Sequence, residues 1–254
     1  MRITILQQDI AWGDPKENCS RAENVIRQYP GSDLYVLPEM FSTGFATKPQ
    51  GIAERDSYSL SWMKRTAHDT RAAIAGSIAV EEGGRFYNRF CFVKPDGSVA
   101  IYDKHHLFTY GGEDKEFTAG GERVVVEWKG FRILLEICYD LRFPVWSRNR
   151  GDYDLIIYVA SWPTTRQSAW DALLRARAIE NQCFLVGVNR VGKDPACEYA
   201  GGSVVLDAFG ETIAACKKGK ECTATAEINM DTLLAFREKF PVLNDADNFS
   251  ISNL

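Results

Sequence analysis

The sequence lacks the features that mark several protein classes. It has three histidines and an odd number of cysteines, seven, with no Cys-x-x-Cys pair. This pattern argues against a disulfide framework and against a structural zinc site. No apolar run approaches the length of a membrane span, and residues 1–9 are too short and too polar for a signal peptide. The net charge of −4 comes without a basic patch, which argues against nucleic-acid binding. We therefore expect a cytoplasmic protein with neither a membrane nor a nucleic-acid partner.

What the chain does have is the composition of a globular protein. Hydrophobic residues make up 45% and charged residues 25% of its 254 residues, and this length is ample for a sizeable core. No linker, internal repeat or low-complexity stretch divides the sequence. We expect one domain that spans residues 1–254.

Strand-like and helix-like segments alternate along the chain. Asp14 followed by Pro15 marks the start of a helix, whereas Pro95-Asp96-Gly97 and Lys129-Gly130 are hairpin turn signals. Helices are expected over residues 14–28, 59–70 and 168–182. Strands are expected over residues 1–9, 33–38, 72–80, 85–93, 99–103, 123–128, 131–138, 154–160, 183–189, 203–207, 211–216 and 224–228. Because helices follow several strands while hairpins recur, the expected fold class is α/β with mixed sheets.

Residues 131–144 place a cysteine where α/β enzymes often carry their chemistry. An apolar strand leads to Cys138, and Pro144 then forces the chain to turn. Strand ends of this kind line ligand-binding crevices. A cysteine attacks as the thiolate, so a nucleophilic Cys138 requires a base or a positive charge nearby. The alternative is a buried structural cysteine, the usual role of this residue type. We assign that structural role to the other six: Cys19, Cys91, Cys183, Cys197, Cys216 and Cys222.

Two further segments offer partners for such a cysteine. Glu39 ends an apolar strand beside aromatic residues and could act as a general base; its alternative is a surface glutamate. Lys104 follows another strand and could supply the cation that stabilises a thiolate or an oxyanion; its alternative is a solvated lysine. Each residue alone is weak support for a catalytic site. The support comes from the combination of both residues with Cys138.

Together the three segments resemble the signature of the nitrilase superfamily of carbon–nitrogen hydrolases. That signature consists of Glu, Lys and Cys in this order, and here it comprises residues 38–40 (PEM), 102–108 (YDKHHLF) and 138–144 (CYDLRFP). The family also has a second glutamate in a pattern that ends in glycine. Residues 113–120 match this pattern, so that role falls on Glu113. The resemblance covers nearly the whole chain and implies a four-layer αββα sandwich with two mixed sheets.

The resemblance implies acyl transfer in two halves. Glu39 takes the thiol proton, and Cys138 attacks an amide carbon. Lys104 and the backbone N–H of Tyr139 stabilise the tetrahedral oxyanion, and ammonia leaves. Water activated by Glu39 then hydrolyses the thioester, while Glu113 positions Lys104 or the water. No metal or organic cofactor is required, and the partner is a small-molecule amide.

Within the family, the chain is most similar to the omega-amidase branch, which releases ammonia from 2-oxoglutaramate and 2-oxosuccinamate. The similar segments are residues 160–166, 175–182, 189–192 and 236–241. A small keto acid needs a cation for its carboxylate, and guanidinium binds carboxylate in a bidentate manner. Arg166 is the first choice for this cation and Arg142 the second, with pairing to Asp140 or to a backbone carbonyl as the alternative for Arg142. Trp162 and Phe41 are candidates for the pocket wall, with core packing as the alternative.

Other functions remain open within and outside the family. A hydrolase of N-carbamoyl amino acids or of other aliphatic amides would share Glu39, Lys104 and Cys138. A true nitrilase is disfavoured because such chains are longer. A cysteine protease would pair the cysteine with a histidine, and we find no persuasive partner. A catalytically silent binding module would keep the fold without the activity.

Two further expectations concern metal binding and assembly. His105-His106 is a poor metal site, because adjacent residues at a strand end point to opposite sides. The family commonly forms dimers, so we expect a homodimer. In it, residues 244–254 either contact the partner or fray.

Overall fold

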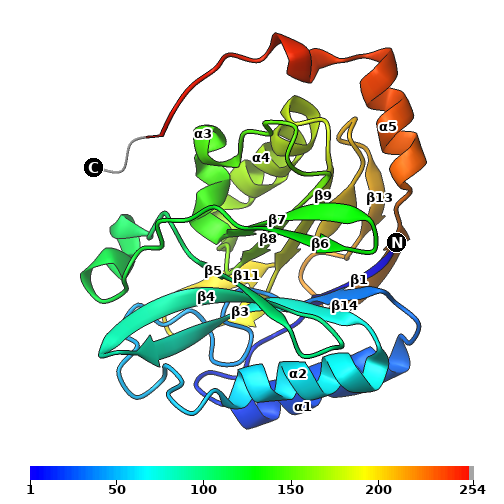
Figure 1. Ribbon diagram of the computed structural model, residues 1–254. Helices are drawn as coiled ribbons and strands as arrows, with labels where there is room; N and C mark the ends of the chain where they lie inside the picture. The colour runs from blue at the N-terminus through cyan, green and yellow to red at the C-terminus, as the bar shows by residue number, and fades with distance from the viewer. Residues whose placement is uncertain (252–254) are drawn as a thin grey trace.

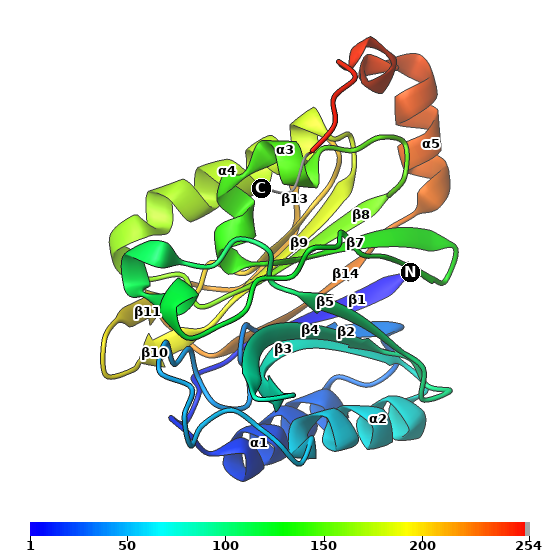
Figure 2. The same ribbon diagram turned by 60° about the vertical axis from the view of Figure 1, so that its left-hand side comes forward.

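Two mixed six-stranded sheets packed face to face form the centre of the molecule (Figure 1). The computed structural model describes residues 1–251. Helices cover the outer face of each sheet, so that four layers follow one another from bottom to top in Figure 2. The expected α/β class with mixed sheets is confirmed, and so is the αββα sandwich.

The first sheet has a parallel centre with antiparallel strands on both sides. Its strands in spatial order are β14 (Cys222–Glu227), β1 (Arg2–Gln7), β2 (Leu34–Val36), β3 (Ala73–Glu82), β4 (Arg85–Val93) and β5 (Val99–Asp103). The central strands β1, β2 and β3 are parallel. β3, β4 and β5 are joined as antiparallel hairpins, the second of them at the expected turn around Pro95-Asp96-Gly97.

The second sheet repeats this plan. Its strands in spatial order are β13 (Thr212–Ala215), β12 (Val204–Leu206), β9 (Phe184–Asn189), β8 (Leu155–Ala160), β7 (Phe131–Ile137) and β6 (Val125–Trp128). The central strands β7, β8 and β9 are parallel. β6 and β7 form the expected hairpin, and its turn residues Lys129 and Gly130 both have positive φ. Such backbone angles suit a tight two-residue turn between twisted strands.

Helices complete the outer layers. α1 (Pro15–Gln28) and α2 (Tyr58–Thr70) cover the first sheet, whereas α3 (Pro144–Ser147) and α4 (Gln167–Glu180) cover the second. α1 begins as expected, with Pro15 in its first turn and the Asp14 carboxylate accepting a hydrogen bond from the Glu17 N–H at 3.0 Å. α5 (Met230–Lys239) packs at one end of the second sheet, where Arg237 donates to the Asp154 carboxylate just before β8 and to the carbonyl of Gln182 just before β9. No helix within residues 1–251 is both long and apolar enough to cross a bilayer.

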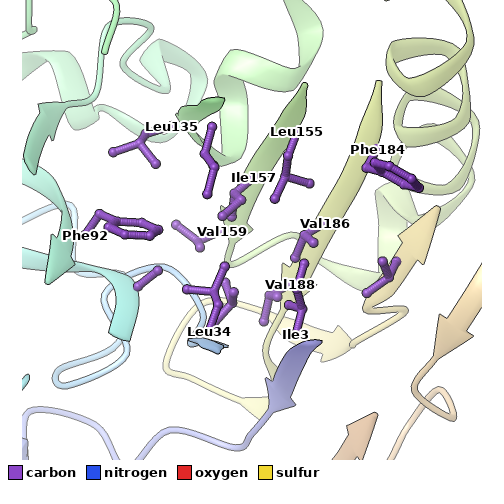
Figure 3. Packing of buried hydrophobic residues seen from close by; sticks show 14 of the residues in the cluster. Ile3, Leu34, Phe92, Leu135, Leu155, Ile157, Val159, Phe184, Val186 and Val188 are labelled. Carbon is purple, nitrogen blue, oxygen red and sulfur yellow. The ribbon is translucent and has the colours of Figure 1, made fainter. Parts of the chain in front are cut away.

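The main core fills the space between the two sheets (Figure 3). The first sheet contributes Ile3, Leu34 and Phe92. The facing side of the second sheet contributes Leu135, Leu155, Ile157, Val159, Phe184, Val186 and Val188. Fully burying an aliphatic or aromatic side chain contributes roughly 1.5–3 kcal/mol, so this dry layer fixes how the sheets stack. Two smaller clusters lie under α1 and α2 and under α4.

The sequence pattern missed two helices and two strands. The four-residue α3 is too short to show a helical period. α5 has a weak apolar stripe with one buried residue, Leu233, and the hairpin strands β10 (Val191–Lys193) and β11 (Glu198–Ala200) are too short to show alternation. The helix expected over residues 168–182 ends at Glu180. Short 3-10 turns, which have no periodic signal, carry much of the site: η1 (Thr109–Gly111), η2 (Glu113–Lys115), η3 (Cys138–Arg142) and η4 (Thr164–Arg166).

Candidate active site

The candidate active site lies where strands of both sheets end on the same side of the molecule. Glu39 follows β2, Lys104 follows β5 directly, and Cys138 follows β7 directly. Packing the two sheets face to face therefore brings the three segments together, although they are far apart in the sequence. The side chains of Glu39 and Lys104 are fully buried.

Cys138 occupies a strained turn at the end of β7. Its φ of 46° lies in the left-handed region, which non-glycine residues rarely adopt and which costs on the order of 1–3 kcal/mol. The chain leaves the strand through η3 and enters α3 with Pro144 in the first turn. This bend points the cysteine out of the sheet and into the pocket described below.

The carboxylate of Asp140 holds this turn in place. It accepts hydrogen bonds from the backbone N–H of Ile137 at 3.0 Å and from the Tyr102 hydroxyl at 2.8 Å. It also accepts a hydrogen bond from the backbone N–H of His106 at 2.9 Å. Asp140 is fully buried, so the segment after β5 and the segment after β7 are tied together through one carboxylate.

Lys104 lies between two buried carboxylates. Its Nζ donates to Glu39 Oε1 at 3.0 Å and to Glu113 Oε2 and Oε1 at 2.8 and 3.1 Å. The remaining oxygen of Glu39, Oε2, accepts a hydrogen bond from the backbone N–H of Ser161 at 2.7 Å. Glu39 also lies close enough to the Cys138 thiol for its negative charge to raise the pKa of that thiol. One cluster thus contains a thiol, a carboxylate near it and a buried ammonium group.

Glu113 reaches this cluster from η2, and Gly120 allows its loop to fold back. The Glu113 Oε2 atom accepts a hydrogen bond from the backbone N–H of Phe108 at 2.7 Å. The N–H of Gly120 donates to the carbonyl of Lys104 at 3.0 Å. A Cβ on Gly120 would lie 2.1 Å from the carbonyl oxygen of Asp103. The glycine that closes the 113–120 pattern is therefore required for this close approach.

Burial and mutual charge set the protonation of the cluster. Burial is the main cause that raises the pKa of the Cys138 thiol well above its usual range; Glu39 adds to the effect and Lys104 opposes it. Burial alone would lower the pKa of Lys104, but Glu113 and Glu39 outweigh it and leave the pKa raised. Burial also raises the pKa of Glu113, against the attraction of Lys104. The resting cysteine is therefore a neutral thiol, which needs a base at the moment of attack.

A small pocket opens over Cys138, with a cavity volume of about 50 Å³. This volume suits a short substrate, since one water occupies roughly 10–15 Å³ on the same measure. The wall consists of Phe45, Lys104, Phe108, Tyr139, Arg142, Ser161, Trp162, Pro163, Arg166, Cys197 and Tyr199. Most of this wall is apolar, and its positive charges come from Lys104, Arg142 and Arg166.

Both arginines at the pocket pack their guanidinium groups over aromatic rings. Arg166 packs over the ring of Phe108 at 5.2 Å, and Arg142 packs over the ring of Trp162 at 5.0 Å. Neither side chain makes a hydrogen bond or an ion pair with any residue in the described range 1–251. The expected alternative, in which Arg142 pairs with Asp140, is not found. The partners of Asp140 are Tyr102, His106 and Ile137 instead.

Three sequence-based expectations about surrounding residues are wrong. Phe41 is not part of the pocket wall. It packs in the core, where its ring centroid lies 5.6 Å from that of Trp62. The chain turns after Phe41 and presents Phe45 to the pocket instead. Cys197, which we assigned to a structural role, lines the pocket from the β10–β11 hairpin.

The third correction concerns the two adjacent histidines. Residues 105 and 106 lie in a loop beyond β5. Their rings therefore do not point to opposite sides, and the two ring centroids are 4.6 Å apart. His105 stacks on Trp146, and His106 stacks on Phe143. Within residues 1–251 no group of three or more His, Cys, Asp or Glu side chains is arranged to hold a metal ion.

Sequence analysis also missed two polar residues that contact the buried carboxylates. Ser161 does so through its backbone N–H, which leaves no trace in a side-chain pattern. Asn88 does so through its side chain and left a signal that could have been used. In the alternation of β4 it shares the inward face with Phe90 and Phe92, where an amide needs hydrogen-bond partners.

Comparison with known proteins agrees with this geometry. Residues 2–238 match the model of the carbon-nitrogen hydrolase family. The chain is 46% identical over 250 residues to the omega-amidase YafV of Yersinia enterocolitica, covering 98% of each chain. It is 36% identical to a 2-oxoglutaramate amidase of Bacillus subtilis, covering 96% of each chain.

A solved structure extends the comparison to three dimensions. XC1258 from Xanthomonas campestris, described as a CN-hydrolase superfamily protein with an arsenic adduct in the active site, is 41% identical. It superimposes with a TM-score of 0.96, and the alignment covers 99% of each chain. The layers and the strand ends that carry the site are therefore common to both proteins.

Proposed function

This chain belongs to the carbon-nitrogen hydrolase family and hydrolyses amide C–N bonds, and on that premise we propose that it releases ammonia from the omega-amide of a small 2-oxo acid. One observation carries the proposal. The Cys138 thiol lies near a buried carboxylate and a buried ammonium group in a small pocket, and the side chains of the two arginines that line this pocket make no hydrogen bond or ion pair within residues 1–251. The names of the two similar amidases support the same substrate class.

In the first half of the reaction, Cys138 is acylated. Glu39 takes the thiol proton as the sulfur attacks the amide carbon, so that no free thiolate has to persist against its raised pKa. Negative charge develops on the amide oxygen, where Lys104 Nζ and the backbone N–H of Tyr139 stabilise it. Glu39 then gives its proton to the leaving nitrogen, the C–N bond breaks, and ammonia departs. A thioester remains on Cys138.

In the second half, water restores the enzyme. Glu39 takes a proton from a water molecule as its oxygen attacks the thioester carbon, and the same two donors stabilise the second oxyanion. The C–S bond breaks, the carboxylic acid leaves, and the proton on Glu39 returns to the sulfur. Glu113 does not exchange protons in this scheme. Its two oxygens hold Lys104 at 2.8 and 3.1 Å and thereby orient the ammonium group.

The substrate carboxylate is assigned to an arginine. Arg166 and Arg142 both border the pocket without a side-chain partner within the described residues, and a guanidinium group can bind a carboxylate through two parallel hydrogen bonds. Arg166 is the first choice because it is half-buried, whereas Arg142 is exposed. Trp162 forms the wall between them through its contact with Arg142.

A substrate panel tests the proposal. We expect the fastest ammonia release from 2-oxoglutaramate and 2-oxosuccinamate, slower release from glutamine and asparagine, and none from a simple nitrile. If ammonia is released from 2-oxoglutaramate no faster than from glutamine, the assignment of a keto-acid amide as substrate is wrong. The protein is then a thiol amidase of undefined substrate. Faster hydrolysis of N-carbamoyl-β-alanine would establish the alternative of a carbamoyl amino acid hydrolase. No turnover on any substrate would favour a silent binding module.

The proposal extends to the organisation of the protein. We propose a single domain over residues 1–254, supported by the continuous core between the sheets. A cytoplasmic location is supported by seven free cysteines, which are typical of a reducing compartment. We also propose a homodimer. Light scattering on the protein as it elutes from a size-exclusion column would test this through the molar mass. Phe249 contacts Arg150 of its own chain, and residues 252–254 of the tail lie outside the described residues.

A further inference from the structure

One buried polar side chain of the first sheet is not used by the mechanism above. Asn88 lies in β4, is fully buried, and shares its face with the core residues Phe90 and Phe92. A primary amide in such a position must find partners or pay the cost of desolvation. Its partners are the catalytic cluster and not other parts of the sheet.

Asn88 contacts all three charged residues of the cluster. Its Nδ2 donates to Glu39 Oε1 at 2.8 Å and to Glu113 Oε1 at 3.1 Å. Its backbone carbonyl accepts a hydrogen bond from the N–H of Lys104 at 3.0 Å. Within residues 1–251, Lys104 and Asn88 are the two side chains that bond to both carboxylates.

The orientation of the amide follows from charge. Both N–H groups of Nδ2 point toward carboxylate oxygens, whereas the amide oxygen, Oδ1, is buried without a hydrogen-bond partner in the described chain. A flipped amide would point its oxygen at two carboxylates, which is repulsive. The side chain thus leaves one of its own polar atoms unsatisfied in order to donate twice to the cluster, which is unfavourable for stability alone.

We infer that Asn88 is a positioning residue that holds Glu39 and Glu113 at a fixed separation around Lys104. The inference rests on the proposed roles of these groups. Lys104 contributes one positive charge against two carboxylates, and a neutral amide adds two donors without adding charge. Asn88 fixes Glu39 Oε1, and the backbone N–H of Ser161 fixes Oε2. Together these two contacts determine how the Glu39 carboxylate is oriented toward the Cys138 thiol.

Two variants test this inference. Asn88→Ala removes both donors, and Asn88→Asp keeps the shape but introduces a third carboxyl group. The charged groups that contact Asn88 are Glu39 after β2, Lys104 after β5 and Glu113 in η2. The Cys138 thiol lies beyond them, near Glu39 and Lys104. Asn149→Ala is the matched control. Asn149 is also a buried asparagine with several hydrogen bonds, but it lies before β8, at the opposite end of that strand from Ser161.

For Asn88→Ala we expect kcat to fall roughly 10-fold to 100-fold, as for the loss of hydrogen bonds to charged groups, with KM changed little. Without the donors the carboxylates hold protons more readily, so the acid limb of the kcat/KM profile should move to higher pH. Asn88→Asp should move that limb in the same direction, because three adjacent carboxyl groups cannot all ionise. Asn149→Ala should lower the melting temperature without moving the profile.

A readout independent of substrate separates this inference from the proposed function. The rate at which iodoacetamide alkylates the Cys138 peptide, followed by mass spectrometry against pH, should change in both Asn88 variants in the same direction as in Glu39→Gln. That result can be obtained even if no omega-amide is hydrolysed. An unchanged alkylation profile and an unchanged pH profile in Asn88→Asp would overturn the inference, as would a rise in KM with kcat intact. Should Asn88→Ala fail to fold, Asn88→Asp alone decides.

Discussion

At the residue scale, the proposed chemistry depends on a thiol that burial keeps neutral and on the Glu39 carboxylate near it. Cys138→Ser should therefore keep the fold and lose nearly all turnover, because a hydroxyl group is a much weaker nucleophile in the same position. Wild-type protein treated with amide should carry an acyl adduct on the Cys138 peptide, detected by mass spectrometry. Substantial activity in Cys138→Ala would refute the thioester mechanism.

Lys104 and Glu113 belong to one ion pair but should respond differently to substitution. Lys104→Ala removes an oxyanion donor, and turnover should fall on the order of 100-fold to 1,000-fold or more. Glu113→Gln should slow turnover while leaving KM largely intact, since it disturbs only the orientation of Lys104. Steady-state kinetics measures both, with the exposed Lys64→Ala as control. Losses of no more than a few-fold in both variants would remove these residues from the mechanism.

Arg166 sets specificity in our proposal, so its loss should depend on the substrate. Removing one partner of a desolvated charge pair costs about 2–5 kcal/mol, hence roughly thirty-fold to several-thousand-fold in kcat/KM. Arg166→Ala should show this loss with 2-oxoglutaramate and little change with a simple aliphatic amide, which has no carboxylate. Equal losses on both substrates would mean that Arg166 supports the geometry of the site. No loss on either would move the assignment to Arg142.

At the scale of elements, the loop from η2 to β6 must fold back closely on the end of β5. Gly120→Ala places a Cβ against the carbonyl oxygen of Asp103, so the loop should shift and carry Glu113 away from Lys104. We expect a marked loss of turnover with the sheets intact by circular dichroism. The neighbouring Gly121→Ala is the matched control, because a Cβ there meets no atom within 4 Å. Equal effects of the two substitutions would argue against the close approach as the reason for the glycine.

At the scale of the whole molecule, one buried acid should make folding stability depend on pH. Glu136 lies in β7, and both its carboxyl oxygens lack a hydrogen-bond partner within residues 1–251. Burial, and secondarily Asp140, raises the pKa of Glu136 well above its usual range. The folded protein then holds a proton that the unfolded chain releases above about pH 4.3. Its contribution to stability is complete below that pH and is lost as the pH rises toward the raised value.

Glu136→Gln should remove this dependence. Compared with wild type, the free energy of unfolding of the variant should fall less steeply from about pH 5 to about pH 8, and the difference should grow with pH. Urea unfolding at several pH values measures it, with the exposed Glu127→Gln as control. Parallel curves for wild type and Glu136→Gln would mean that Glu136 is ionised in the folded protein or paired through water.

The sequence by itself determined the local features of this protein. Apolar alternation and turn residues specified most strands and the hairpins at Pro95-Asp96-Gly97 and Lys129-Gly130, because these signals depend on neighbours in the chain. The motifs around Glu39, Lys104 and Cys138 indicate the proposed chemistry through residue type and order alone. The expected pattern from Glu113 to Gly120 has its physical reason in the close approach at Asp103.

Only the tertiary structure decided which side chains meet. Whether Phe41 or Phe45 faces the pocket depends on a turn after β2, and whether His105 and His106 separate or touch depends on where β5 ends. Asn88 joins Glu39 and Glu113 because β4 lies between β3 and β5, and both carboxylates come from segments that follow strands of this same sheet. Such contacts join segments tens of residues apart, and they follow from the order of strands and the packing of two sheets, which no local pattern encodes.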